Sequence, residues 1–278
     1  MQPKLYISFT SIPTRINNID KLLHSISKQT LQPDKIIIHY PRYCIRLQKF
    51  YDIHLLQDKI KRSILRDKIM VNYTKDYGPI TKIYPITALD FIHDDDAIII
   101  IDDDNYYHPL LFELLYKEFI RYKQREAICI SGVYYPRKIN SLYHIFSPSQ
   151  CCELMEAWAG YIIKKSFLKY NLRWWTIAEL HTIHAIKKKY FWHSFLSDDY
   201  VISRYLDKYN IKKRVLSSYR LLNRNNCIMC LRSPDNLGNV HGNLNNYIKS
   251  ESELILHKFF SKATIKSLKG AQKKSLQF

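Results

Sequence analysis

The stretch Ala97-Ile98-Ile99-Ile100-Ile101-Asp102-Asp103-Asp104 decides the fold class, because an unbroken apolar run ends in three aspartates. A β-branched run of this length is typical of a strand buried on both faces, as in a parallel sheet covered by helices. In open α/β sheets, ligands bind beyond the carboxyl ends of such strands. The three aspartates therefore occupy a position where a ligand is expected.

These aspartates predict a metal site, because three carboxylates at one strand end repel one another unless a cation lies among them. Oxygen ligands suit hard divalent ions, which favours Mn²⁺ or Mg²⁺. Asp102 and Asp104 are the predicted ligands, since alternate residues of an extended segment point to the same side; Asp103 would point away, toward a ribose or a neighbouring group. In the alternative interpretation the triplet is a solvated turn, and one aspartate only caps the helix that follows.

Outward from this run, strands and helices alternate. The expected strands lie at residues 4–10, 35–40, 69–73, 97–101 and 127–131. Apolar residues at helical spacing predict helices at residues 19–26, 83–91 and 109–123. In the basic segment between the second and third strands, the expected core contacts are Leu55, Ile60 and Ile64. The alternation predicts an α/β fold with a mostly parallel sheet flanked by helices.

Beyond residue 132 the alternation is less regular, which predicts a smaller region after the main sheet. Residues 133–137, 157–163 and 214–216 favour strands, and residues 178–188 and 198–209 favour helices. Residues 261–278 are rich in Lys and Ser, as in a disordered basic tail.

The composition bounds the class of protein. The 278 residues are 46% hydrophobic, which fits a globular protein with one large domain. No apolar run approaches the ~20 residues that span a bilayer, and residues 1–9 lack the pattern of a secretory signal, so we expect a cytoplasmic protein without a transmembrane segment. The net charge of +18 is compatible with nucleic acid, an anionic surface or an acidic substrate. Because no stripe of interleaved Arg and aromatic residues is present, we expect no specific nucleic acid partner and at most weak contact with anionic surfaces.

Six cysteines are present, and their number alone does not predict a disulfide framework in a chain of this length. Cys227 and Cys230 have the spacing of half a zinc site, which Cys151, Cys152 or His241 would complete. Reduced, partly buried thiols are the other interpretation, and we favour it.

Four segments give the chain a resemblance to a known family. They are Ile7-Ser8-Phe9-Thr10-Ser11-Ile12-Pro13-Thr14-Arg15 with Ser27-Lys28-Gln29-Thr30 and Pro33-Asp34-Lys35-Ile36; Asp76-Tyr77-Gly78-Pro79 with Thr81-Lys82; Asp102-Asp103-Asp104; and Ser197-Asp198-Asp199. In this order they resemble the nucleotide-binding first βαβ unit, the second nucleotide contact, the DXD metal motif and the catalytic-base motif of GT-A fold glycosyltransferases. The closest resemblance is to the family-2-like enzymes of bacteria, algae and large DNA viruses. One departure is that Arg204 sits one position earlier than the arginine that follows the family's base motif, which leaves Asp198 and Asp199 hard to separate.

The resemblance implies a fold and a domain order. A GT-A-like, Rossmann-like domain would cover residues 1–220, with the nucleotide-sugar half at 1–131 and the acceptor half at 132–220. The resemblance does not extend beyond residue 215. From composition alone we expect a C-terminal extension at 221–260 that closes the site and a basic tail at 261–278. If the chain is viral, its location would be the host cytoplasm.

The resemblance also implies an activity, that of an inverting, metal-dependent hexosyltransferase. It would move a sugar from a UDP-sugar to a hydroxyl of a glycan, glycolipid or glycoprotein, with Asp199 or Asp198 as general base. His241 would be a third metal ligand beside Asp102 and Asp104. The implied nucleotide-binding residues are Thr10, Ile12, Arg15, Asp76, Lys82 and Asp103, and the implied sugar or acceptor residues are Glu156, Trp158 and Gly160.

Two other functions stay open on the sequence. The same aspartates would also serve a Mg²⁺-dependent phosphoryl-transfer enzyme or nuclease that acts on a polyanion. The absence of a Walker loop excludes only the common nucleotide hydrolases. A non-catalytic basic binding module would leave both acidic motifs unexplained.

Overall fold

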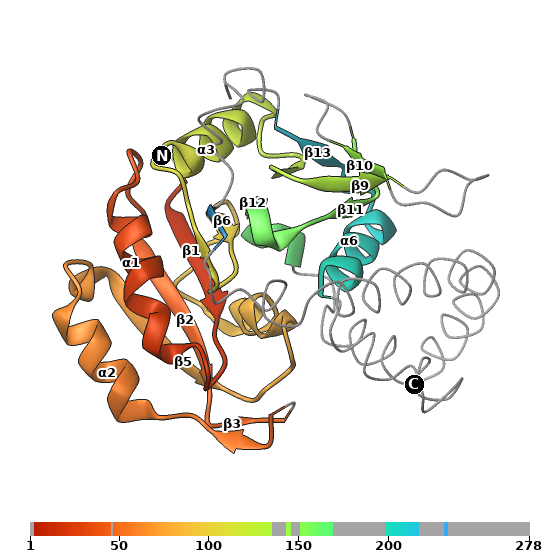
Figure 1. The fold of residues 1–278 in the computed structure, drawn as a ribbon. Helices are drawn as coiled ribbons and strands as arrows, with labels where there is room; N and C mark the ends of the chain where they lie inside the picture. The colour runs from red at the N-terminus through yellow and green to blue at the C-terminus, as the bar shows by residue number, and fades with distance from the viewer. Residues whose placement is uncertain are drawn as a thin grey trace, which may run out of the picture.

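The computed structural model describes residues 3–45, 47–134, 143–145, 151–168, 198–216 and 231–232 (Figure 1). Its centre is a seven-stranded sheet in the order β13-β8-β12-β6-β1-β2-β5. The strands are β1 (Leu5–Thr10), β2 (Lys35–Pro41), β5 (Ile69–Thr74), β6 (Ala97–Ile100), β8 (Ala127–Cys129), β12 (Tyr161–Lys164) and β13 (Lys213–Val215). Only β12 runs antiparallel to its neighbours in this sheet. The expected α/β fold with a mostly parallel sheet is confirmed.

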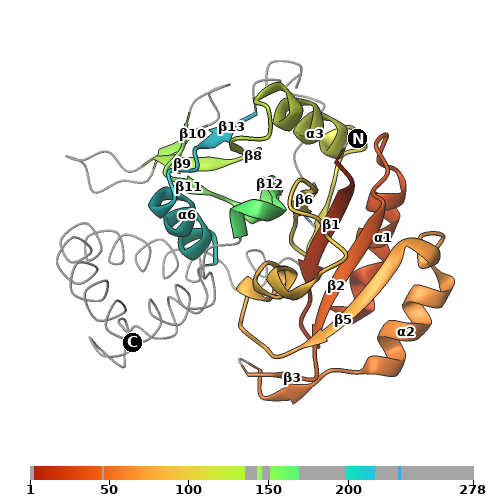
Figure 2. The same cartoon turned by 180° about the vertical axis from the view of Figure 1, so that it is seen from behind.

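Side chains alternate along the strands and divide the core into two clusters, one on each face of the sheet. In β1, Ile7 and Phe9 belong to one cluster and Tyr6 to the other. The first cluster packs under α1 (Ile19–Ser27), α2 (Ile53–Arg62) and α3 (Leu111–Arg121). The second cluster packs under α6 (Asp198–Lys208) and two short 3₁₀ helices, η3 (Ile80–Lys82) and η4 (Tyr84–Ala88). This face of the sheet is turned toward the viewer in Figure 2.

The isoleucine run forms the centre of this core, because β6 pairs with β1 on one side and β12 on the other. Ile98, Ile99, Ile100 and Ile101 are all fully buried. Burying one such side chain contributes about 1.5–3 kcal/mol. The run therefore holds both faces of the sheet together and places the aspartates that follow it at the carboxyl edge.

Two predictions in the N-terminal part are wrong. The helix expected at 83–91 is instead a pair of 3₁₀ helices, η3 (Ile80–Lys82) and η4 (Tyr84–Ala88). Proline near the start of η4 removes an N–H that a continuous helix would need. Ile64, an expected core contact, is 81% exposed, and Leu56 is the fully buried residue of α2.

Residues 157–163 are not one strand. A 3₁₀ helix, η5 (Ala157–Ala159), precedes β12, and Gly160 joins the two with a φ of +88°. Residues with side chains rarely adopt this left-handed conformation, so the glycine separates the two elements. The helix expected at 178–188 and the tail at 261–278 lie outside the described residues.

Three small sheets accompany the main one in the described part of the chain. The strands β9 (Gly132–Tyr134), β10 (Tyr143–Ile145) and β11 (Leu154–Met155) form the first, and β3 (Tyr43–Cys44) with β4 (Lys49–Phe50) forms a hairpin. In the third, β14 (Leu231–Arg232) pairs with β7 (Asn105–Tyr106). A late segment of the chain thus lies beside the turn that follows the three aspartates. Within the part of the chain that the structure describes, no helix has the length and apolar character needed to cross a membrane.

Candidate functional site

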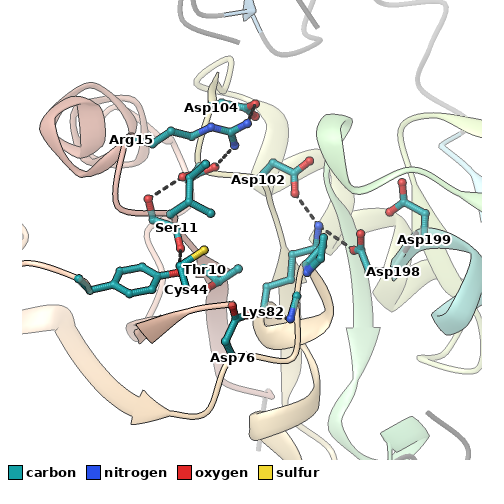
Figure 3. Close-up of a pocket in the computed structure, with 15 residues that line it drawn as sticks. Thr10, Ser11, Arg15, Cys44, Asp76, Lys82, Asp102, Asp104, Asp198 and Asp199 are labelled. Atoms are coloured by element: carbon teal, nitrogen blue, oxygen red, sulfur yellow. Dashed lines mark hydrogen bonds and ion pairs between the residues drawn. The ribbon is translucent and has the colours of Figure 1, made fainter. Parts of the chain in front are cut away.

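A cavity of about 180 Å³ lies at the carboxyl ends of β1 and β6 (Figure 3). This is the edge at which open α/β sheets bind ligands. The residues that line it are Thr10, Ser11, Ile12, Arg15, Cys44, Tyr51, Asp76, Gly78, Pro79, Lys82, Asp102, Asp103, Asp104, Asp198 and Asp199. The structure therefore brings together the predicted nucleotide, metal and base residues from four separate segments of the sequence.

Arg15 holds the turn of the first acidic motif. One guanidinium nitrogen lies 2.6 Å from an Asp103 oxygen, and another lies 3.1 Å from an Asp104 oxygen. Ser11 Oγ donates to the second Asp103 oxygen at 2.6 Å. Burial by itself would lower the pKa of Arg15, but the neighbouring aspartates outweigh it and raise that pKa. Arg15 is thus a fixed cation at the cavity wall.

The directions predicted for the three aspartates are wrong. The expected direction of Asp103 is away from the other two, yet Asp103 shares Arg15 with Asp104. Asp102 contacts Lys82 instead (Figure 3). The reason is local backbone geometry, because the chain leaves the extended conformation after β6 and turns at Asp103 and Asp104. Alternation along a strand does not continue through a turn.

Lys82 joins the two acidic motifs. Its ammonium lies 2.5 Å from Asp102 Oδ1 and 2.8 Å from Asp198 Oδ2 (Figure 3). The side chain is buried, which by itself would lower its pKa, but Asp102, Asp198 and Asp199 more than compensate and raise it. Lys82 is therefore charged, and it connects the end of β6 to the start of α6.

A buried chain of hydrogen bonds fixes the backbone of Lys82. Ser8 Oγ donates to the Lys82 carbonyl at 2.6 Å, and His39 Nε2 lies 3.0 Å from the same Oγ. Asn72 Nδ2 lies 2.9 Å from His39 Nδ1. Because the single hydroxyl proton of Ser8 goes to Lys82, His39 must donate from Nε2 and accept at Nδ1. Burial lowers the pKa of His39 to about 3, so this ring is neutral.

Ser8, His39 and Asn72 were not predicted to belong to the site. The signal that was available is a polar side chain inside an apolar strand: Ser8 in Leu5–Thr10 and His39 in Lys35–Pro41. Buried polar groups are nearly always hydrogen-bonded, so such a residue points to an internal partner.

Asp198 and Asp199 begin α6 and are both nearly inaccessible to solvent. Asp199 Oδ1 accepts a hydrogen bond from the backbone N–H of Ala157 at 3.0 Å. Asp198 is the ion-pair partner of Lys82, so the two adjacent carboxylates have different surroundings. Ser197, the residue that would cap this helix, lies outside the described residues.

The cavity has an excess of negative charge. Among the described residues, six aspartates and two cationic side chains line it. Burial raises the pKa of Asp104 to about 7, Asp103 adds to this effect, and Arg15 only partly opposes it. An additional cation would therefore be stabilised here.

The donor set fits a divalent ion that is held jointly with a phosphate ligand. No group of three His, Cys, Asp or Glu side chains arranged to hold a metal occurs within the described ranges. Magnesium, however, is commonly held by one or two carboxylates together with substrate phosphates. Asp102 and Asp104 are the carboxylates available for such an ion, whereas His241 lies outside the described residues.

Asp76 has a structural role at the rim of the cavity. Its two oxygens accept backbone N–H groups of Ile45 and Gly78, each at 2.7 Å. The carboxylate thereby ties the β3–β4 hairpin to the turn before η3. The nucleobase contact remains a prediction for this residue.

The predicted sugar and acceptor residues are not among those that line the cavity in the described part of the chain. Glu156 accepts a hydrogen bond from Ser131 Oγ at 2.5 Å. Trp158 packs against the first core cluster, and Gly160 is buried. Cys44, Cys129, Cys151 and Cys152 are free thiols, while Cys227 and Cys230 lie outside the described residues.

Comparison with known proteins adds little to this description. No protein-family model and no curated protein matches the chain. Among solved structures, the 2-C-methyl-D-erythritol 4-phosphate cytidylyltransferase of Francisella tularensis has a TM-score of 0.41 and 13% sequence identity, over 78% of this chain and 90% of that one. A likeness at this level supports no conclusion about activity, which must be argued from the site.

Proposed function

We propose that the protein is a metal-dependent glycosyltransferase that moves a sugar from a nucleoside-diphosphate sugar, UDP-sugar in the first instance, to a hydroxyl of a glycan, glycolipid or glycoprotein. One observation carries the proposal. A single cavity at the carboxyl edge of the sheet joins Arg15 and Lys82 to the aspartates of both acidic motifs. Glycosyl transfer needs both sets of groups, because a diphosphate must leave while a hydroxyl is deprotonated.

The two cations suit the diphosphate of the donor. Arg15 presents a planar fork of N–H donors, and Lys82 presents a compact charge on a flexible stem. Both are buried or nearly so, and in such surroundings their attraction for a phosphate is less screened than in water. The pair would bind the phosphates and stabilise the charge that develops as the diphosphate departs.

Asp102 and Asp104 would hold Mn²⁺ or Mg²⁺ together with oxygens of the donor, and His241 is proposed as a third ligand. When bound, the metal ion would neutralise part of the negative charge on the leaving group. The excess of aspartates in the cavity supports this role, because it leaves a cation favoured even after Arg15 and Lys82 are counted.

Asp199 is the better candidate for the general base. Asp198 is held by its ion pair with Lys82, whereas Asp199 accepts a hydrogen bond from the backbone N–H of Ala157; both carboxylates line the cavity. The base would accept the proton of the acceptor hydroxyl as its oxygen attacks the anomeric carbon. Direct attack opposite the leaving group inverts the anomeric configuration.

The same cavity argues against the rival function, cleavage of a nucleic acid or another polyanion. Its walls carry six aspartates against two cations among the described residues, which repels a polyanion that brings no excess of metal. A nucleotide sugar brings only one diphosphate and enters with a divalent metal, so it adds far less negative charge to the cavity than a nucleic acid does.

The test separates binding from chemistry. Thermal unfolding is measured with UDP, GDP, CMP and their sugar conjugates, with and without Mn²⁺, on the wild type, Asp102→Asn and Asp199→Asn. We expect one nucleotide to stabilise the wild type only with metal, by about 2.7 kcal/mol at a hundredfold excess over its Kd. Asp102→Asn should lose this effect; Asp199→Asn should keep it and lose sugar transfer. Stabilisation by no nucleotide, together with Mg²⁺-dependent cleavage of RNA or DNA, would overturn the proposal.

A further inference from the structure

Lys82 occupies the place at which the two acidic motifs meet. Its ammonium touches Asp102 Oδ1 and Asp198 Oδ2, and its side chain is buried. The Asp102 side chain, by contrast, is 30% exposed and lines the cavity. The carboxylate that would face an incoming metal ion therefore already holds a cation that belongs to the protein.

Only the far end of Lys82 is able to move. Its carbonyl is held by Ser8, and the neighbouring Thr81 is fully buried and accepts a hydrogen bond from the Tyr77 N–H. The four-carbon stem of a lysine is flexible, and its ammonium binds through charge rather than through a fixed fork. The charged group can therefore change partners while the backbone stays in place.

Arg15 does not have this freedom. Its guanidinium contacts Asp103 and Asp104 through different nitrogens, and Ser11 holds Asp103 from the other side. A cation held by two carboxylates through a planar fork is geometrically constrained. Of the two cationic side chains that line the cavity in the described ranges, Lys82 is the one that can leave its aspartates for a ligand, whereas Arg15 would contact a phosphate from its fixed position.

A free divalent ion at Asp102 would meet the ammonium of Lys82 at close range, and the two like charges would repel each other in a buried site. The repulsion disappears when the ammonium moves to an anion. A nucleoside diphosphate supplies this anion, and its remaining phosphate oxygens bind the metal at the same time.

We propose that Lys82 makes metal binding conditional on the nucleotide: its ammonium excludes a free divalent ion from Asp102, and a nucleoside diphosphate draws the ammonium away, so that metal and diphosphate enter together. The inference rests on the proposed function, because it assumes that the cavity takes a nucleoside diphosphate. It adds a role for Lys82 that a simple phosphate contact does not have.

The experiment measures Mn²⁺ bound to the protein by the enhancement of water proton relaxation, which separates protein-bound Mn²⁺ from the free ion and its small chelates. It uses the full chain with Mn²⁺ alone and with Mn²⁺ plus UDP. The variants are Lys82→Met, which removes the charge, Lys82→Gln, which keeps a hydrogen-bond donor for the aspartates, and Lys82→Arg, which keeps the charge. Lys213→Met is the matched control, because Lys213 is also buried and paired with an aspartate, Asp207, away from the cavity.

We expect the wild type to bind Mn²⁺ alone at least tenfold more weakly than Mn²⁺ with UDP. Lys82→Met and Lys82→Gln should bind Mn²⁺ alone at least tenfold more tightly than the wild type does, and UDP should improve their Mn²⁺ affinity by a much smaller factor. Lys213→Met should behave like the wild type, and Lys82→Arg should still exclude Mn²⁺ alone because it keeps the positive charge. If Lys82→Met fails to fold, the inference is still tested by Lys82→Gln and by the wild-type affinity for Mn²⁺ with and without UDP.

Two results would overturn the inference. One is wild-type protein that binds Mn²⁺ alone as tightly as with UDP, and the other is neutral Lys82 variants with no gain in affinity for Mn²⁺ alone. Either result leaves the proposed function standing if UDP and Mn²⁺ still bind together. Failure of every nucleotide to bind the wild type would count against the proposed function, whereas the affinity of the neutral variants for Mn²⁺ alone would still test the exclusion by Lys82.

Discussion

Asp104 shows at the scale of one residue that the cavity is short of positive charge. Its pKa is raised to about 7, from an ordinary value of 3.8, by burial, by Asp103 and by Asp102. Between these two pH values the folded protein holds a proton that the unfolded chain has lost. The stability that this proton gives is complete below about pH 4 and is lost as the pH rises through 7.

This shift predicts how Asp104→Asn changes the pH dependence of stability. The variant removes the titrating group. Its free energy of unfolding, relative to that of the wild type, should therefore increase as the pH rises from 5 to 8, by at most about 1.4 kcal/mol per pH unit. Urea unfolding at several pH values measures the difference. Curves that stay parallel from pH 5 to 8 would show that Asp104 titrates normally in the folded protein.

His39 has the opposite sign and serves as an internal comparison. Burial lowers its pKa to about 3, so below about pH 6.5 the unfolded chain takes up a proton that the folded protein does not. Its contribution to stability is complete above pH 6.5 and is lost as the pH falls toward 3. A rise in pH therefore weakens the contribution of Asp104 to stability and strengthens the contribution of His39.

At the scale of elements, the hydrogen bonds from Asn72 to the Lys82 carbonyl connect β5, β2 and β1 to η3. Each strand supplies one polar side chain, and the chain ends on the residue that bridges the two acidic motifs. Ser8 is not among the residues that line the cavity, so a change at Ser8 should reach the site through the backbone of Lys82.

Ser8→Ala tests this connection. It leaves the Lys82 carbonyl and His39 Nε2 without their Ser8 partner in a buried place, while His39 Nδ1 keeps Asn72. We therefore expect a loss of about 1–3 kcal/mol in the free energy of unfolding and weaker joint binding of Mn²⁺ and UDP. Ser25→Ala is the control, because Ser25 is also buried but donates to Leu22 within α1. The control should lose some stability and keep its ligand affinity. Equal ligand affinity in both variants would leave the hydrogen-bond chain with a purely structural role.

Much of the fold was predictable from the sequence, because apolar residues recur along a helix or strand at the spacing of its buried face. The isoleucine run and the spacing of Ile19, Leu22, Leu23 and Ile26 each indicated an element that the structure contains. The pair η3 and η4 was missed, because apolar residues in a 3₁₀ segment also recur every three or four positions, as Ile80, Ile83 and Ile86 do.

The gathering of the aspartates was predictable from the sequence, but their geometry was not, and Glu156, Trp158 and Gly160 do not line the cavity in the described part of the chain. Clustered acids after strands indicated which residues would gather at the carboxyl edge. The turn at Asp103 and Asp104 and the bridge from Lys82 to Asp198 depend on residues far apart in the chain, and no local pattern encodes them. Ser8 and His39 were overlooked because a polar residue inside a strand shows that a partner exists without showing which one.

At the scale of the whole molecule, the net charge of +18 contrasts with an acidic cavity. The positive charge therefore lies mainly elsewhere, where salt screens it. Contacts that depend on it should be separable from binding in the cavity.

We expect any binding of RNA or heparin to weaken steeply between 50 and 200 mM salt, as is general for contacts with polyanions. UDP with Mn²⁺ should not displace the polyanion, and Asp102→Asn should not change its affinity. Fluorescence anisotropy of a labelled oligonucleotide measures both. Displacement by UDP and Mn²⁺ would place the polyanion in the cavity and favour the nuclease interpretation.

The antiparallel strand β12 has a consequence for how the protein is made. It fills the position between β6 and β8, so one backbone edge of the isoleucine strand stays open until residues 161–164 have left the ribosome. Arg15 finds both of its aspartates early in synthesis, but Lys82 waits for Asp198, roughly ten seconds later at ordinary rates. During that interval the nascent chain exposes an apolar strand edge, which is the kind of surface that chaperones bind and that drives aggregation when synthesis outpaces folding.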